Sequence, residues 1–111
     1  MSPEHVFVVY GSLAPGRPNH KKLSQIEGVW KQGSILGKLE SRGWGSAMGY
    51  PGYVKSDASE TIHVYLLFSE QLPDHWPQLD AFEGDDYERT VIEFTTLEGE
   101  VGEGYIYALK E

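Results

Sequence analysis

The stretch Val6-Phe7-Val8-Val9-Tyr10, with the loop after it, is the part of the sequence around which the fold is organised. Its residues are β-branched or aromatic, and such a run ended by a glycine is typical of a buried strand. Gly and Pro recur in the next segment, Gly11-Ser12-Leu13-Ala14-Pro15-Gly16-Arg17-Pro18-Asn19-His20, and restrict its backbone. A loop of this kind can direct several backbone N–H groups at one anion. The residues alone equally allow an ordinary strand and turn.

The composition indicates a globular chain, and its 111 residues predict one domain over residues 1–111. There is no cysteine, and the four histidines lack ligand spacing, so we expect no disulfide and no metal site. No apolar run approaches the roughly 20 residues that a membrane span needs. The N-terminus lacks the pattern of a signal peptide, which favours a cytoplasmic protein.

The charge is unevenly distributed along the chain. Residues 1–55 contain seven Lys/Arg and three Asp/Glu, whereas residues 56–111 contain two and fourteen, and the net charge is −8. An acidic protein repels phosphate backbones, so nucleic acid is not an expected partner. The basic group at Arg17, His20, Lys21 and Lys22 is either a solvated face or an attraction for a small anion.

Strands are predicted over residues 29–40, 53–55, 61–68, 87–97 and 101–109, with a helical turn over 20–26. One helix is indicated by a stripe of apolar residues at helical spacing, namely Leu72, Trp76, Leu79 and Phe82. We expect Asp74 to cap its N-terminus, Pro77 to lie in its first turn and Gly84 to end it.

These elements do not alternate as in βαβ folds, so they indicate the α+β class. Glycines within long strands favour a sheet that curls. We therefore expect a small mixed β-barrel of five to seven strands with one or two short helices. The loop over residues 42–52, rich in Gly and aromatic residues, is either a pocket wall or a plug for the core.

Glu83 is the candidate catalytic residue. It lies at the predicted helix end beside Phe82, and Asp80 lies three positions earlier on the same helix. Burial and a neighbouring like charge both raise the pKa of a carboxyl group, which suits a general base near neutral pH. The alternative is an exposed acid in an acidic half of the chain. Ser12 has no evident base and orienting partner, and no nucleotide-binding motif occurs.

Three motifs together resemble the γ-glutamylcyclotransferase-like superfamily, most closely its small γ-glutamylamine cyclotransferase branch. They are Tyr10-Gly11-Ser12-Leu13 with the following Gly16 and Pro18-Asn19-His20, Leu79-Asp80-Ala81-Phe82-Glu83-Gly84 with Tyr87 and Arg89, and Gly104-Tyr105-Ile106-Tyr107. They occur in the order of the family and span nearly the whole chain.

The resemblance implies a small α+β barrel and a lyase that converts a γ-glutamyl amide to 5-oxoproline and a free amine without a cofactor. It assigns the acid/base role to Glu83 and the substrate pocket to Tyr10, Gly11, Ser12 and Leu13. Backbone N–H groups of this loop are suited to an oxyanion. Tyr87 and Tyr105 are further candidates for substrate binding. Arg89 either pairs with the substrate carboxylate or is a structural partner of Asp80 or Glu88.

The expected partner is therefore a small γ-glutamyl substrate, and a monomer is favoured. Departures from the family pattern in residues 61–68 and 43–51 affect the expected leaving group more than the reaction. The alternative function is a non-catalytic module that binds a small carboxylate or an amino-acid-like ligand in the same pocket. A weaker alternative is an interaction domain that uses the loop around Trp44.

Overall fold

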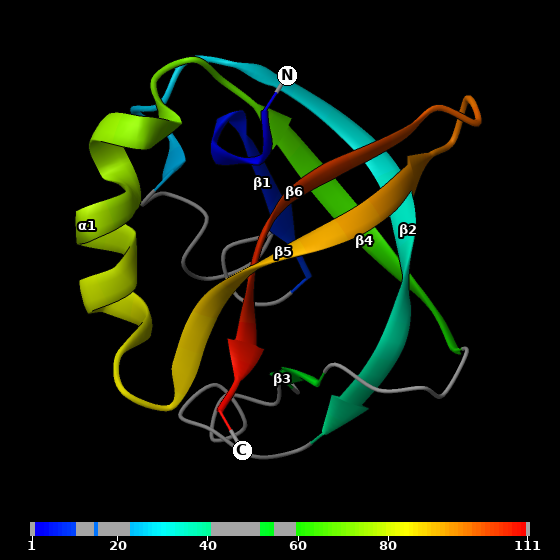
Figure 1. The fold of residues 1–111 in the computed structure, drawn as a ribbon. Helices are drawn as coiled ribbons and strands as arrows, with labels where there is room; N and C mark the ends of the chain where they lie inside the picture. Colours follow the sequence, from blue (N-terminus) through cyan, green and yellow to red (C-terminus); the bar gives the residue numbers. More distant parts are fainter. Residues whose placement is uncertain (1, 11–14, 16–22, 41–51, 55–59, 111) are drawn as a thin grey trace.

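The computed structural model describes residues 2–10, 15, 23–40, 52–54 and 60–110 of the chain. In this part, one helix covers one side of a curled sheet (Figure 1). The elements are the 3-10 turn η1 (Pro3–His5), β1 (Val6–Val9), β2 (Val29–Glu40), β3 (Gly52–Val54), β4 (Glu60–Phe68), α1 (Leu72–Glu83), β5 (Tyr87–Thr96) and β6 (Val101–Leu109).

The six strands form one mixed sheet in the order β1-β4-β2-β3-β6-β5. In addition, β1 pairs with β6, so the first strand in this order also contacts a strand near the other end of the sheet. A pairing of β2 with β5 adds a second contact of this kind. Where β2 meets β5, a Cβ on Gly33 would lie 2.4 Å from the carbonyl oxygen of Thr95, so this crossing requires glycine. The predicted α+β class is confirmed, and the strand number lies in the expected range.

The core has two layers because both faces of β1 are covered. All four residues of β1 are buried, and it pairs with β4 on one side and β6 on the other. Val6 and Val8 pack inside the curled sheet, while Phe7 and Val9 pack toward α1. The continuous apolar run of β1 therefore reflects burial on both faces, as the sequence predicts.

Helix α1 begins three residues earlier than the sequence indicates. Its N-cap is Gln71, Asp74 lies in the first turn and makes no capping bond there, and Pro77 lies inside the helix. The prediction of Asp74 as N-cap is wrong because Pro73, preset for the first turn of a helix, lies at its start. Pro77 is exposed and removes one backbone hydrogen bond without burying an unpaired group.

The end of α1 is as predicted. Gly84 follows the last helical residue with φ +78°, and its N–H donates to the carbonyl of Asp80 at 3.1 Å. Side chains with a Cβ rarely adopt this φ, so glycine suits the position. Leu72, Trp76 and Leu79 are buried against the sheet, which confirms the predicted stripe.

The strands agree with the predicted bounds within one or two residues at each end, whereas the 3-10 turn η1 was not predicted. Leu23 and Ile26 are both buried, as expected of the segment after the first loop. The Gly- and aromatic-rich loop up to residue 51 and the loop residues 11–14 and 16–22 lie outside the described residues. Their predicted roles stay predictions.

Candidate acid/base site

Glu83 projects from the last turn of α1 and is partly buried. Burial raises the pKa of its carboxyl group from the ordinary value of 4.5 to about 7. Removal from water disfavours the charged form, so the group exchanges its proton near neutral pH. This agrees with the expected effect of burial.

Asp80 does not act on Glu83 as the sequence suggests, because burial is the cause of the raised pKa of Glu83. The carboxylate of Asp80 instead forms an ion pair with Arg89, with 3.1 Å between Oδ1 and Nε. Arg89 also donates from its second terminal nitrogen to Oδ2 at 3.3 Å. The positive charge of Arg89 offsets the negative charge that was expected to act on Glu83.

Tyr10 follows β1 and lies near Glu83. Its hydroxyl donates to the carbonyl of Tyr107 and accepts from the N–H of Tyr53, each at 2.7 Å. Burial raises the pKa of Tyr10, and the charges of Tyr87 and Glu83 raise it further. Tyr10 therefore joins β3 to β6 beside the candidate carboxyl group.

Tyr107 of β6 is the second hydroxyl close to Glu83. It donates to Oδ1 of Asp80 at 2.7 Å, and its pKa is raised by burial, by Asp80 and by Glu83. Through Asp80, the last turn of α1 therefore contacts Tyr107 on β6 and Arg89 on β5. The sequence alone did not indicate this role of Tyr107, although the antiparallel register of β5 and β6 places Tyr107 opposite Arg89.

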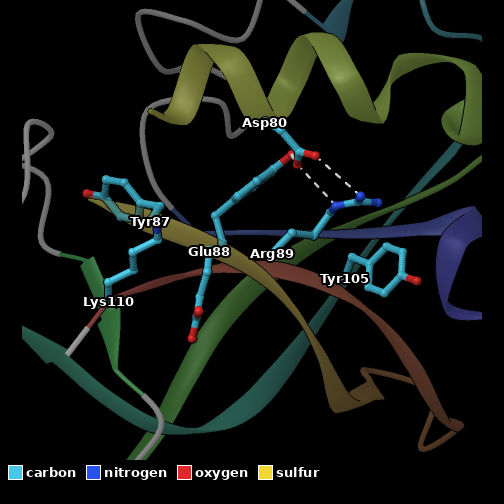
Figure 2. Close-up of a pocket in the computed structure, with 7 residues that line it drawn as sticks. Asp80, Tyr87, Glu88, Arg89, Tyr105 and Lys110 are labelled. Atoms are coloured by element: carbon cyan, nitrogen blue, oxygen red, sulfur yellow. Dashed lines mark hydrogen bonds and ion pairs between the residues drawn. The ribbon is translucent and has the colours of Figure 1, made fainter. Parts of the chain in front are cut away.

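A groove of about 370 Å³ runs between α1 and the hairpin of β5 and β6. Figure 2 shows Asp80 pointing from α1 toward Arg89, with Tyr87 and Tyr105 on opposite sides of that pair. The guanidinium of Arg89 lies 4.8 Å from the ring centres of Trp76 and Tyr105. The groove is lined by Asp80, Tyr87, Glu88, Arg89, Tyr105, Tyr107 and Lys110.

The charges of Glu83 in α1 and Tyr87 in β5 both act on Tyr10, which follows β1. Arg89 and Tyr105 lie along the groove, where Arg89 is a partner of Asp80, one of the two roles left open above. Gly11, Ser12 and Leu13 lie outside the described residues. The carboxyl group of Glu83, which exchanges its proton near neutral pH, acts electrostatically on the hydroxyl of Tyr10. A carboxyl group with such a pKa suits general acid/base chemistry.

In the described part of the chain, no group of three His, Asp or Glu side chains could hold a metal ion. Among the same residues, no helix is long and apolar enough to cross a membrane.

A curled mixed sheet with one covering helix defines a small α+β fold, and this fold places a partly buried carboxyl group at the end of the helix. Residues 6–111 match the family model described as gamma-glutamyl cyclotransferase, AIG2-like. The chain therefore belongs to this family. Membership supports a cyclotransferase-like function, and an enzyme at that coarse level.

Solved structures share the fold. YkqA from Bacillus subtilis is 26% identical with a TM-score of 0.72, and the match covers 96% of this chain and 36% of YkqA. An AIG2-like protein from Mus musculus is 24% identical with a TM-score of 0.66, covering 94% of this chain and 76% of the mouse protein. A γ-glutamyl cyclotransferase is 16% identical with a TM-score of 0.66, covering 96% and 67%.

This chain thus spans about a third of the length of YkqA, whereas it spans most of the mouse protein. The similarity to the mouse protein and the similarity to the γ-glutamyl cyclotransferase structure show the fold alone. A search of the curated proteins found no match.

Proposed function

We propose that this protein is a γ-glutamyl cyclotransferase of the small γ-glutamylamine cyclotransferase branch, and that it acts without a cofactor. It converts a γ-glutamyl amide to 5-oxoproline and a free amine. The observation that carries the proposal is the partly buried carboxyl group of Glu83, whose pKa of about 7 suits proton transfer in both directions. The family match and the three sequence motifs support the reaction class.

The reaction needs little more than proton transfer, because the nucleophile belongs to the substrate. The α-nitrogen of the glutamyl group attacks the γ-carbonyl carbon of the same molecule. Because the two atoms are tethered, the effective concentration of the nucleophile is very high. The new C–N bond forms the ring, and the bond to the leaving nitrogen breaks. Two protons pass from the α-nitrogen to the leaving nitrogen, and Glu83 relays them in turn as base and then as acid.

Other residues bind the substrate and stabilise the charge that develops. Backbone N–H groups of Gly11, Ser12 and Leu13 are proposed to donate to the oxyanion of the tetrahedral intermediate. Tyr10 and Tyr87 are proposed to bind the substrate beside Glu83 and to exclude water from it. Tyr105 and Arg89 extend the binding surface along the groove.

The test measures 5-oxoproline released from a panel of γ-glutamyl amides and dipeptides. We expect the wild type to release it from at least one substrate and Glu83→Gln to be at least about 100-fold slower, since general acid/base catalysis contributes roughly that much. The matched control is Asp85→Asn, which removes an exposed carboxylate two positions away and keeps wild-type activity. The kcat/KM of the wild type should rise as the pH passes about 7 and Glu83 loses its proton.

Equal rates for the wild type and Glu83→Gln would remove Glu83 from the mechanism. No release by a folded wild type from any substrate would overturn the proposal. Binding of 5-oxoproline or glutamate, measured by calorimetry and retained in Glu83→Gln, would then indicate the non-catalytic binding module. From the sequence we also expect a monomer and a cytoplasmic location.

A further inference from the structure

The guanidinium of Arg89 is held by a two-point contact and lies beside two aromatic rings. Its Nε lies 3.1 Å from Oδ1 of Asp80, and its Nη2 donates to Oδ2 at 3.3 Å. The ring centres of Trp76 and Tyr105 each lie 4.8 Å from the guanidinium, and the Arg89 side chain exposes only 28% of its surface. A lone ion pair at a surface stabilises little, whereas a forked arginine–carboxylate pair fixes the relative orientation of its partners.

Asp80 connects this contact to the end of α1. Its Oδ1 also accepts from the hydroxyl of Tyr107 at 2.7 Å, and its backbone carbonyl accepts from the N–H of Gly84 at 3.1 Å. The second of these bonds closes the last turn of the helix, and Glu83 lies within that turn. One residue therefore links β5 and β6 to the backbone that carries the candidate acid/base.

The last turn of α1 has less apolar burial than the turns before it. The buried residues of the helix are Leu72, Trp76 and Leu79, and none of residues 80–83 is fully buried. Helix ends fray, and this one is followed by a glycine, whose backbone has more conformational freedom than that of other residues. The polar contacts of Asp80 therefore act where the apolar packing of the helix is weakest.

We propose that Arg89 is a positioning residue, which holds Asp80 against β5 and thereby fixes the last turn of α1, from which Glu83 projects. Its effect on the rate rests on the proposed function, because a fixed carboxyl group matters only if Glu83 transfers protons. The Arg89–Asp80 anchor acts on the backbone of the turn, whatever the partners of the Glu83 carboxyl group are. Its effect on the backbone is therefore measurable without a substrate.

Direct contact with the substrate is the competing role of Arg89, since this residue also lines the groove. The two roles have different kinetic consequences. Loss of a group that binds the substrate equally before and during the reaction raises KM, whereas displacement of a proton-transferring group lowers kcat. Because Asp80 engages the fork of Arg89, we expect the effect on kcat.

The first measurement is ¹⁵N relaxation of the backbone amides in the wild type, Arg89→Met and Arg89→Lys. In the wild type, the order parameters of Glu83 and Gly84 should be about 0.85, the value of a rigid backbone. In Arg89→Met, which keeps an apolar stem but has no donor, they should fall toward about 0.6. Arg89→Lys keeps the charge without the fork and should lie between the two.

Two controls separate a local effect from a general loosening of the fold. The N–H of Gly99 donates to the carbonyl of Thr96 at 2.9 Å in the turn between β5 and β6, and its order parameter should not change. Lys38→Met removes the cation of an ion pair with Glu40 on β2, where the charged atoms lie 4.0 Å apart, and should leave the end of α1 rigid. Far-UV circular dichroism verifies that each variant is folded.

The second measurement is a double-mutant cycle on the release of 5-oxoproline. Asp80→Asn keeps an acceptor for Tyr107 but removes the charge that holds Arg89. We expect Asp80→Asn and Arg89→Met each to lower kcat about tenfold, with KM within about twofold of the wild type. The double variant should be no slower than the slower single variant, because both substitutions remove the same contact.

Unchanged order parameters of Glu83 and Gly84 in folded Arg89→Met would overturn the inference, as would an equal fall at Gly99. If Arg89→Met does not fold, the same comparison in Asp80→Asn decides. A rise in KM at unchanged kcat, or losses that multiply in the double variant, would assign Arg89 to direct substrate binding instead. A wild type without activity removes the proposed function, and the order parameters then decide on the Arg89–Asp80 anchor alone.

Discussion

The free energy of unfolding is lower when the carboxyl group of Glu83 is charged than when it is protonated. Its pKa is about 7 in the folded chain and 4.5 ordinarily, so between these values the folded chain binds a proton that the unfolded chain has lost. The free energy of unfolding therefore falls as the pH rises from about 4.5 to about 7, and no further loss from this group follows above that range.

A variant that carries no charge at position 83 should not lose stability as the pH rises. We expect Glu83→Gln to be more stable than the wild type by about 2 kcal/mol at pH 8, a value reduced from the full shift because the group is not wholly buried. At pH 4 the difference should be near zero. Urea unfolding at both pH values measures it, with Asp85→Asn as the control that shows no such dependence. A Glu83→Gln variant equally stable at pH 8 would contradict the burial of the charge.

At the scale of the element, the end of α1 sets where Glu83 points. Gly84 has φ +78°, and a Cβ there would meet no atom within 4 Å, so the cost of a side chain lies in the backbone alone. Gly99, in the turn between β5 and β6, has φ +92° and equally open surroundings. The two glycines therefore form a matched pair, one beside the candidate site and one in the β5–β6 turn.

Gly84→Ala and Gly99→Ala should each destabilise the chain by about 1 to 3 kcal/mol because alanine is strained at these φ values. Only Gly84→Ala should also slow 5-oxoproline release, since it displaces the last turn of α1. Thermal unfolding and initial rates measure the two effects. Loss of activity in both variants to the same degree would assign the effect to stability rather than to the position of Glu83.

At the scale of the whole molecule, Tyr10 holds the sheet together where β3 and β6 meet. Its hydroxyl satisfies one N–H on β3 and one carbonyl on β6. The parallel β3–β6 register pairs Tyr53 with Ala108, so Tyr10 supplements a short pairing. The first loop motif thus contributes to the closure of the sheet as well as to the candidate site.

Tyr10→Phe should lower the free energy of unfolding by about 2 to 3 kcal/mol because it leaves two backbone groups without their partner. For a chain of this size the unfolding temperature should fall by roughly 10 °C. Calorimetry measures the change, and Tyr65→Phe on β4 serves as the control for loss of a tyrosine hydroxyl. Equal melting temperatures for Tyr10→Phe and the wild type would exclude this structural role.

Most of the elements could be predicted from the sequence because local patterns suffice for them. The run of β1, the stripe of α1 and the stop at Gly84 each depend on neighbours along the chain. The start of α1 was misplaced because two prolines, Pro73 and Pro77, both suit a first turn, and only packing against the sheet selects between them. Candidate residues Glu83 and Tyr10 were identifiable from motifs of the resembling family.

The sequence by itself determined the α+β class, the order of the elements and the acidic candidate at the end of the helix. The tertiary structure alone decided that Glu83 is buried enough for a pKa of about 7 and that Asp80 faces Arg89 and Tyr107. The reason is physical: solvent exclusion and hydrogen-bond partners depend on strands far apart in the chain, and no local pattern records which of them meet.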